Sequence, residues 1–189
     1  MKSIKDKQKE WKRQEIINAV IELSLKENIL DISIEDIAKK SGFAKSSIYY
    51  YFNSKEEIIK EILKNGWKIM LSKIRSVQID ENEPLESLIK VIKAHLEFVQ
   101  EQPKLFKFIS KFTKALIDKE VKKYLEQENK IYLDLINSCI EKGIFKNELK
   151  FIYNSLAGSI RQIAQNEELS FEEKLNYILK DLEKFKVSI

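Results

Sequence analysis

The sequence has little that could cross-link a fold or break it into short strands. Its 189 residues include one Cys, one His, two Pro and four Gly. A lone Cys139 excludes an intrachain disulfide, and Cys139 with His95 supplies too few ligands for a structural zinc site. We therefore expect no metal and no cofactor. So few Pro and Gly residues also disfavour a fold rich in β-hairpins.

Long apolar runs are missing as well. No stretch of about 18 apolar residues is present, which excludes a membrane-spanning helix. The first residues, Met1-Lys2-Ser3-Ile4-Lys5-Asp6, are charged and lack the apolar segment of a signal peptide. We therefore expect a cytoplasmic protein that does not associate with a membrane.

The composition that is present is typical of a folded globular protein, with 43% hydrophobic and 34% charged residues. The net charge of +4 is unevenly distributed. Residues 1–75 carry 16 Lys and Arg against 11 Asp and Glu, and residues 1–13 alone carry six against two. This asymmetry favours contact with a polyanion at the N-terminal end. A solvated, lysine-rich surface explains the charge equally well.

Apolar residues recur at the spacing of amphipathic helices along the chain. Ser33, Ser54 and Ser170 each begin a capping-box pattern, which marks the start of a helix. The sequence therefore predicts an all-α fold of about nine helices, over residues 10–27, 33–40, 45–51, 54–76, 84–102, 105–116, 121–142, 152–163 and 170–185.

Residues 33–55 hold the pattern with the clearest functional meaning. Two short predicted helices with Ser41-Gly42 between them describe a helix-turn-helix. Gly42 can take the positive φ that such a turn needs. The expected apolar interior of this motif consists of Ile34, Ile37, Ala38, Ile48 and Phe52.

The second of these helices exposes hydroxyls, a cation and amphipathic rings, which suit a groove bordered by phosphates. Tyr49 and Tyr50 can donate hydrogen bonds to phosphates, while Lys45 and Ser46 lie early enough on the helix to reach base edges. A partly buried aromatic cluster is the alternative for the tyrosines. Lys55 begins the next helix, where we expect it to bind phosphate. The predicted DNA-binding residues are Ser33, Ala44, Lys45, Ser46, Ser47, Tyr49, Tyr50 and Lys55.

Residues 10–60 resemble the DNA-binding domain of the TetR family of bacterial transcriptional regulators. This chain departs from the family's common residues at several positions, including Ala44 for a Ser or Thr and Ser46 for a Gly. The motifs that carry the resemblance are Asp36-Ile37-Ala38, Gly42, Tyr49-Tyr50-Tyr51-Phe52 and Ser54-Lys55-Glu56.

The resemblance implies a DNA-binding domain over residues 1–53 and a helical regulatory domain over residues 54–189, with helix 54–76 connecting them. It also implies a homodimer, assembled through the last two helices, that binds a palindromic double-stranded operator. The family's usual member is a repressor that a small-molecule effector releases from DNA. We expect an apolar stripe on the last two helices to serve the dimer interface: Ile160, Ile163, Ile178, Leu182 and Phe185.

A mostly apolar cavity in the regulatory domain would suit a hydrophobic effector, such as a fatty-acyl or aromatic compound, with one hydrogen-bonding or anionic head. The ordinary pKa of His95, about 6.5, would let it pair with an acidic head below neutrality. A solid aromatic core is the alternative. The predicted effector-binding residues are Leu88, Ile92, His95, Val99, Phe108, Phe112, Tyr132 and Leu135.

Two other classes of function compete with this interpretation. The first is a helical small-molecule sensor or carrier without operator-specific DNA binding, which the intact Lys45, Tyr49 and Lys55 disfavour. The second is a helical enzyme, but no paired carboxylates, nucleophile–base pair or phosphate loop indicates one. The sequence therefore predicts a DNA-binding regulator and no enzyme.

Overall fold

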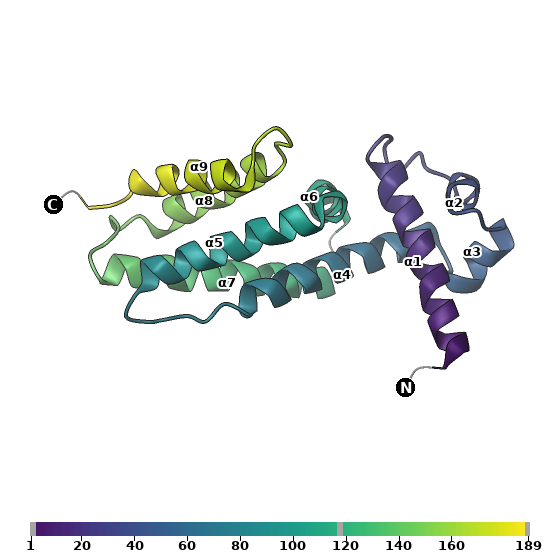
Figure 1. The fold of residues 1–189 in the computed structure, drawn as a ribbon, viewed down its shortest axis with the longest axis horizontal. Coiled ribbons are helices and arrows are strands. Elements are labelled where there is room, and N and C mark those ends of the chain that lie inside the picture. The colour runs from purple at the N-terminus through teal and green to yellow at the C-terminus, as the bar shows by residue number, and fades with distance from the viewer. Residues whose placement is uncertain (1–2, 117–118, 188–189) are drawn as a thin grey trace. The chain divides into compact units, whose positions relative to one another are not determined.

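The computed structural model describes residues 3–116 and 119–187, which form nine α-helices and no strand (Figure 1). The all-α prediction is confirmed. None of these helices combines the length and apolarity needed to cross a bilayer. The helices are α1 (Ile4–Ser24), α2 (Ile34–Ser41), α3 (Lys45–Tyr51), α4 (Lys55–Arg75), α5 (Pro84–Glu101), α6 (Pro103–Leu116), α7 (Lys119–Glu141), α8 (Leu149–Ala164) and α9 (Phe171–Glu183).

Helix α1 begins earlier than the sequence analysis expected. Ser3 and Asp6 form a capping box, in which each side chain binds the other residue's backbone N–H. This box satisfies backbone donors at the helix start and allows α1 to begin at Ile4 instead of residue 10. The basic N-terminal residues from Ile4 onward are therefore helical.

The chain divides into two compact units, which we describe separately. Unit 1 comprises Met1–Gly66 and Lys104–Asp118, and unit 2 comprises Trp67–Pro103 and Lys119–Ile189. These bounds differ from the division expected at residue 53, because α4 runs through both units and α6 belongs to the first.

In unit 1, Gly66 of α4 provides the space in which α6 packs. A Cβ at this position would lie 2.6 Å from Ile109 Cγ2 and 3.2 Å from Leu105 Cδ1, closer than van der Waals contact allows. Helix α6 is also tied to α1, because Lys104 Nζ lies 2.6 Å from Glu22 Oε1 and Lys111 Nζ donates to Ser24 O at 3.1 Å.

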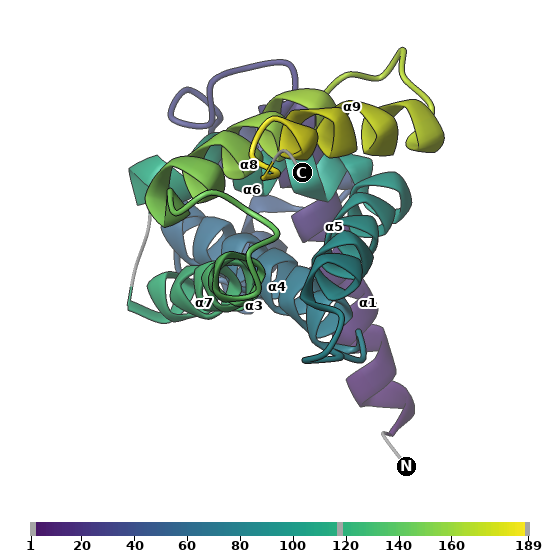
Figure 2. The same cartoon turned by 90° about the vertical axis from the view of Figure 1, so that its left-hand side faces the viewer.

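In unit 2, α5 packs against α7 and α9, and α8 packs against α7 and α9. Figures 1 and 2 both show α8 and α9 side by side. Cys139 is fully buried in this core, and burial raises the pKa of its thiol to about 11. The thiol is therefore protonated near neutrality, consistent with a packing role.

The apolar stripe expected at the dimer interface lies largely in the core of the subunit itself. Ile160, Ile178, Leu182 and Phe185 are each at most 7% exposed, and Ile163 is half-buried. Four of the five residues are therefore covered within the subunit, and only Ile163 keeps exposed surface that could serve the expected dimer interface. The large apolar side chains that these helices and the following segment expose are Phe151, Tyr177 and Val187.

Gly66→Ala tests the close contact between α4 and α6. We expect it to lower the free energy of unfolding by about 1–3 kcal/mol, because the stiff Ile109 side chain must move. Chemical denaturation of the wild type, Gly66→Ala, Ile109→Ala and the double variant gives the coupling between the two sites. The cost of Gly66→Ala should vanish in the Ile109→Ala background. A more stable Gly66→Ala variant would contradict the close packing, since Ala normally stabilises a helix relative to Gly.

Candidate DNA-binding site

Helices α2 and α3 meet across the turn that the sequence predicts. Gly42 has φ 75°, in the left-handed region, and the Phe43 N–H donates to Ala38 O at 3.1 Å. Ile37, Ile48 and Phe52 are each at most 1% exposed, so α2 and α3 share one apolar interior. The helix-turn-helix is therefore a preformed element of unit 1.

The residues at the start of this motif have local roles. The Ser33 hydroxyl accepts from the Asp36 N–H at 3.1 Å and donates to its carboxylate, which completes the capping box of α2. Ala44 is the exposed N-cap of α3 and provides no side-chain hydrogen bond. Of these two predicted contacts, only Ser33 has a polar side chain, and its hydroxyl is already engaged.

The outer face of α3 presents the polar groups that the sequence predicts. Tyr50 is 74% exposed and Tyr49 is 48% exposed, while Lys45 and Ser46 are also exposed. Ser47 is half-buried. Two phenol hydroxyls, an ammonium and a serine hydroxyl thus stand on one short helix, where they can reach phosphates and base edges.

Lys45 does not stand alone on this face, because its ammonium pairs with the exposed carboxylate of Glu35 on α2. The hydrogen bond lowers the pKa of the Glu35 carboxyl and raises the pKa of the Lys45 ammonium. Both side chains are at least half exposed, so solvent screens the pair. DNA can therefore compete with Glu35 for Lys45.

Arg13 connects three helices of unit 1. Its guanidinium donates to Tyr51 O at 2.5 Å at the end of α3 and pairs with Glu61 of α4. The guanidinium carbon also lies 4.1 Å from the centroid of the Phe52 ring. Arg13 therefore fixes the C-terminal end of α3 between α1 and α4, a role that the sequence pattern did not reveal.

Lys55 has a different environment from the one expected. Its Nζ donates to Ile29 O at 2.9 Å, Leu30 O at 2.9 Å and Ile32 O at 2.7 Å. An ammonium has three N–H donors, and these three carbonyls use all of them. Lys55 thus ties the start of α4 to the loop before α2.

The predicted effector residues are all buried, at 6% exposure or less, but they belong to two different units. Phe108 and Phe112 lie on α6 in unit 1, where their ring centroids are 4.9 Å apart. The members of the set that belong to unit 2 are Leu88, Ile92, His95, Val99, Tyr132 and Leu135.

His95 and Tyr132 form a buried polar cluster in unit 2 together with Glu128. His95 Nδ1 lies 3.2 Å from Tyr132 Oη and 3.8 Å from Glu128 Oε1. Burial lowers the pKa of His95 to about 4. Burial raises the pKa of Glu128 to about 7, although the charge of Arg161 partly opposes this shift. His95 is therefore neutral near neutrality, which does not favour the expected pairing of its cation with an acidic head group.

Glu128 is not among the site residues predicted from the sequence. Its position was readable from the pattern, because it precedes Tyr132 by four residues and so shares the inner face of α7. Glu128 lies 3.8 Å from the imidazole, and the burial that disfavours its charged form also disfavours an anionic group bound beside it.

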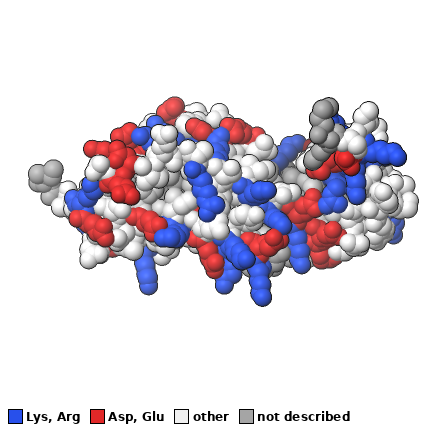
Figure 3. Space-filling model, turned by 90° about the horizontal axis from the view of Figure 1, so that it is seen from below, with Lys and Arg blue, Asp and Glu red and all other residues white. Residues whose placement is uncertain are grey.

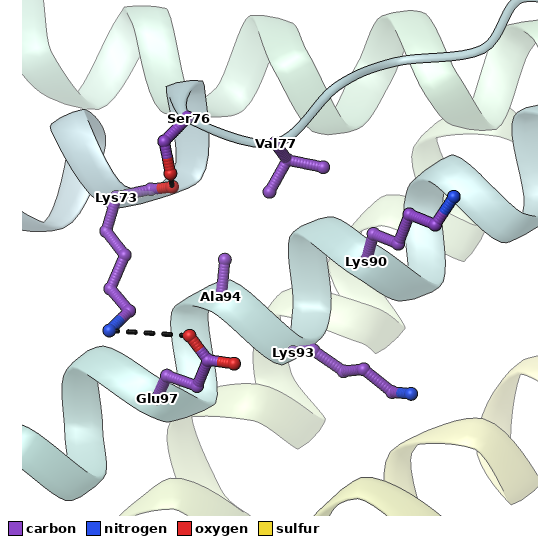
Figure 4. Close-up of a pocket in the computed structure, with 7 residues that line it drawn as sticks. All are labelled: Lys73, Ser76, Val77, Lys90, Lys93, Ala94 and Glu97. Carbon is purple, nitrogen blue, oxygen red and sulfur yellow. Dashed lines mark hydrogen bonds and ion pairs between the residues drawn. The ribbon is translucent and has the colours of Figure 1, made fainter.

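A surface cavity of about 420 Å³ lies elsewhere in unit 2, between the end of α4 and α5 (Figure 4). Ala94 and Val77 face the hollow, whereas the ammonium of Lys73 is paired with Glu97 at its edge. None of the eight predicted effector residues lines it. The lining consists of Lys73, Ser76, Val77, Lys90, Lys93, Ala94 and Glu97.

The helix-turn-helix also matches a known protein family. Residues 16–62 match the family model described as "Bacterial regulatory proteins, tetR family". The matched segment contains the whole helix-turn-helix and the start of α4.

Relatives are similar over most of their length. The HTH-type transcriptional repressor KstR2 of Mycobacterium tuberculosis is 24% identical over 142 residues, which cover 73% of this chain and 71% of that protein. The fatty acid metabolism regulator protein of Bacillus subtilis is 24% identical over 144 residues, 76% of this chain and 74% of the relative.

The solved structure of the KstR2 ketosteroid transcriptional regulator of Mycobacterium tuberculosis has the same fold. It superposes with a TM-score of 0.79 at 18% identity and covers 93% of this chain and 95% of that one. The preformed helix-turn-helix, the family match and these relatives all indicate the same kind of protein. The chain belongs to the TetR family of bacterial regulatory proteins and is a DNA-binding transcriptional regulator.

Proposed function

We propose that this protein is a cytoplasmic repressor whose homodimer binds a palindromic operator and leaves it when a small hydrophobic effector binds. The observation that carries the proposal is the exposed polar face of α3, with Lys45, Ser46, Tyr49 and Tyr50 on a preformed helix-turn-helix. The names of the relatives, a transcriptional repressor and a fatty acid metabolism regulator, support a role in regulating transcription.

In the complex with DNA, the start of α3 enters the major groove. Lys45 and Ser46 approach base edges there, while Tyr49 and Tyr50 donate hydrogen bonds to phosphates. Lys45 exchanges Glu35 for a DNA acceptor, which removes a favourable ion pair and leaves Glu35 near the phosphates. Two such helices in a dimer would reach successive grooves about 34–36 Å apart.

The dimer forms through one face of α8 and α9. Phe151 is 64% exposed and Tyr177 is 53% exposed, which leaves aromatic surface for a partner. Gly158 lies seven residues after Phe151 on the same face of α8, and a Cβ there would meet nothing within 4 Å inside the subunit. A glycine that the subunit's own packing does not require is explained by the close approach of a partner helix.

The effector has an apolar body and a neutral hydrogen-bonding head. The apolar side chains around His95 and Tyr132 suit the body, and the neutral imidazole and phenol suit an alcohol, ketone or ester. Glu128 disfavours a free carboxylate at this place. The names of the relatives, which mention ketosteroid regulation and fatty acid metabolism, fit ligands of this chemistry.

The proposal and its main alternative, a small-molecule carrier that does not read DNA, differ in one measurement. Fluorescence anisotropy compares duplex DNA from the protein's own promoter with a scrambled duplex of equal length. We expect the promoter to bind at least about 10³-fold more tightly at physiological salt. Equal affinities for the two duplexes would support the carrier.

Lys45 and Lys55 should behave differently in the same assay. Lys45→Ala should reduce the preference for promoter over scrambled DNA by about ten-fold or more, because it removes a base contact. Lys55→Gln should lower the thermal unfolding midpoint and leave the salt dependence of binding unchanged, because three backbone carbonyls lose a charged donor. A flatter salt dependence with unchanged stability would instead place Lys55 among the phosphate contacts.

Gly158→Arg tests the dimer face. Inside the subunit the new side chain has room, so we expect a folded chain with an unchanged circular dichroism spectrum. The variant should sediment as a monomer and bind operator weakly, because the arginine blocks the partner helix. Gln100→Arg, at an exposed position of α5, is the matched control and should remain a dimer. A dimeric Gly158→Arg variant would exclude this face.

The His95–Glu128 pair makes a prediction about stability and pH. Glu128 has a raised folded pKa, so its contribution is present below about pH 4.5 and is lost as pH rises through about 7. His95 has a lowered folded pKa, so its contribution is present above about pH 6.5 and is lost as pH falls through about 4. Between pH 4.5 and 6.5 the two effects oppose each other.

Single variants should reveal each effect. Glu128→Gln leaves only the effect of His95, so its stability should rise as pH rises from about 4 to 6.5. His95→Gln leaves only the effect of Glu128, so its stability should fall from about 4.5 to 7. The change in each case is on the order of 3 kcal/mol. Urea unfolding across this range measures both. Parallel pH profiles for wild type and both variants would show that neither group titrates as described.

A further inference from the structure

The first two turns of α1 combine exposed apolar and basic side chains that the fold leaves without an assigned role. Trp11 is 56% exposed, an unusual state for the largest aromatic side chain. Lys5, Lys7 and Lys9 are also exposed, and none forms an ion pair within the part of the chain that the structure describes. The Ser3–Asp6 capping box holds these residues in helix.

Trp11 lies beside the turn that precedes α3, the helix proposed to enter the major groove. Its ring meets the Phe43 ring edge to face, with centroids 6.1 Å apart, and Phe43 comes two residues before Lys45. Two residues farther along α1, Arg13 holds Tyr51 at the other end of α3. This part of α1 therefore contacts the turn before α3 and the last residue of α3.

Lys7 lies on the same face of α1 as Trp11. Residues four apart lie on the same side of a helix, so Lys7 shares that face one turn earlier. Residues two apart do not share a face, so Lys9 points away from it. The Trp11 indole N–H has no hydrogen-bond partner among the described residues, and it is a donor only.

We propose that Trp11 and Lys7 form a DNA contact outside the helix-turn-helix, in which the indole N–H and the ammonium bind phosphates beside the groove that receives the start of α3. The proposal rests on the DNA binding proposed above. A helix about 10–12 Å across does not fit a minor groove about 6 Å wide, so α1 reaches only the backbone. The contact adds affinity that is independent of base sequence.

The distribution of charge agrees with a local contact of this kind. Figure 3 shows Lys and Arg side chains interspersed with Asp and Glu over the face that it draws, without a continuous basic surface there. On such a surface, individual cations close to the recognition helix matter more than the overall charge.

The test measures the affinity of full-length variants for promoter and scrambled DNA between about 50 and 200 mM salt. Lys7→Gln should weaken both duplexes by the same factor and reduce the log–log salt slope by about 1.8 per dimer, the value for two phosphates. Lys9→Gln, with the same change of charge on the other face, should leave the slope unchanged. Trp11→Phe keeps a ring against Phe43 but removes the N–H, and should weaken both duplexes by about two- to ten-fold.

A second readout follows Trp11 directly. The sequence has two tryptophans, so Trp67→Phe leaves Trp11 as the sole tryptophan, whose fluorescence can be excited selectively over that of the tyrosines. Iodide should quench its fluorescence in the free protein and quench it much less when either duplex is bound.

The outcomes separate this inference from the proposed function. Equal salt slopes for Lys7→Gln and Lys9→Gln, or unchanged iodide quenching on DNA, would overturn the α1 contact while promoter binding persists. A wild-type protein that binds neither duplex would overturn the proposed function and this contact together.

Discussion

A recognition helix of seven residues is too short to be stable by itself, so DNA reading in this protein depends on what holds α3 in place. Arg13 binds its C-terminal carbonyl, and Gly42 turns the chain sharply before it. Lys55 fixes the loop before α2 to the start of α4. Two cations from distant parts of the sequence thus anchor the helix-turn-helix through backbone carbonyls, which leaves the polar face of α3 free for DNA.

Unit 2 has its own constraint, a buried polar cluster on α5 and α7. His95 and Tyr132 share a hydrogen bond, and Glu128 lies 3.8 Å from the imidazole. Burial keeps the imidazole neutral and favours a protonated carboxyl. A buried polar group is costly unless it is paired, so in the proposed effector site this cluster would limit which ligands can bind beside it. A ligand with a neutral oxygen can join the network without adding a charge, whereas an anionic head would face Glu128.

Much of the fold could be predicted from the sequence because its signals are local. Helical periodicity and the capping box at Ser33 gave the helices, and Gly42 marked the turn. The Ser3–Asp6 box is equally local and could have placed the start of α1. The roles of Lys55 and Glu128 could not be read locally, because the carbonyls and the imidazole that surround them come from distant segments. An amphipathic pattern likewise shows which face of α8 or α9 is apolar, but not whether its own subunit or a partner covers it.

In the proposed complex, two copies of α3 on a dimer read adjacent major grooves. Hydroxyl-radical footprinting on the protein's own promoter detects this arrangement. We expect two protected backbone segments related by a palindrome, with centres about 10 base pairs or a multiple of that apart. Protection of a single segment, or uniform protection that follows no palindrome, would contradict it.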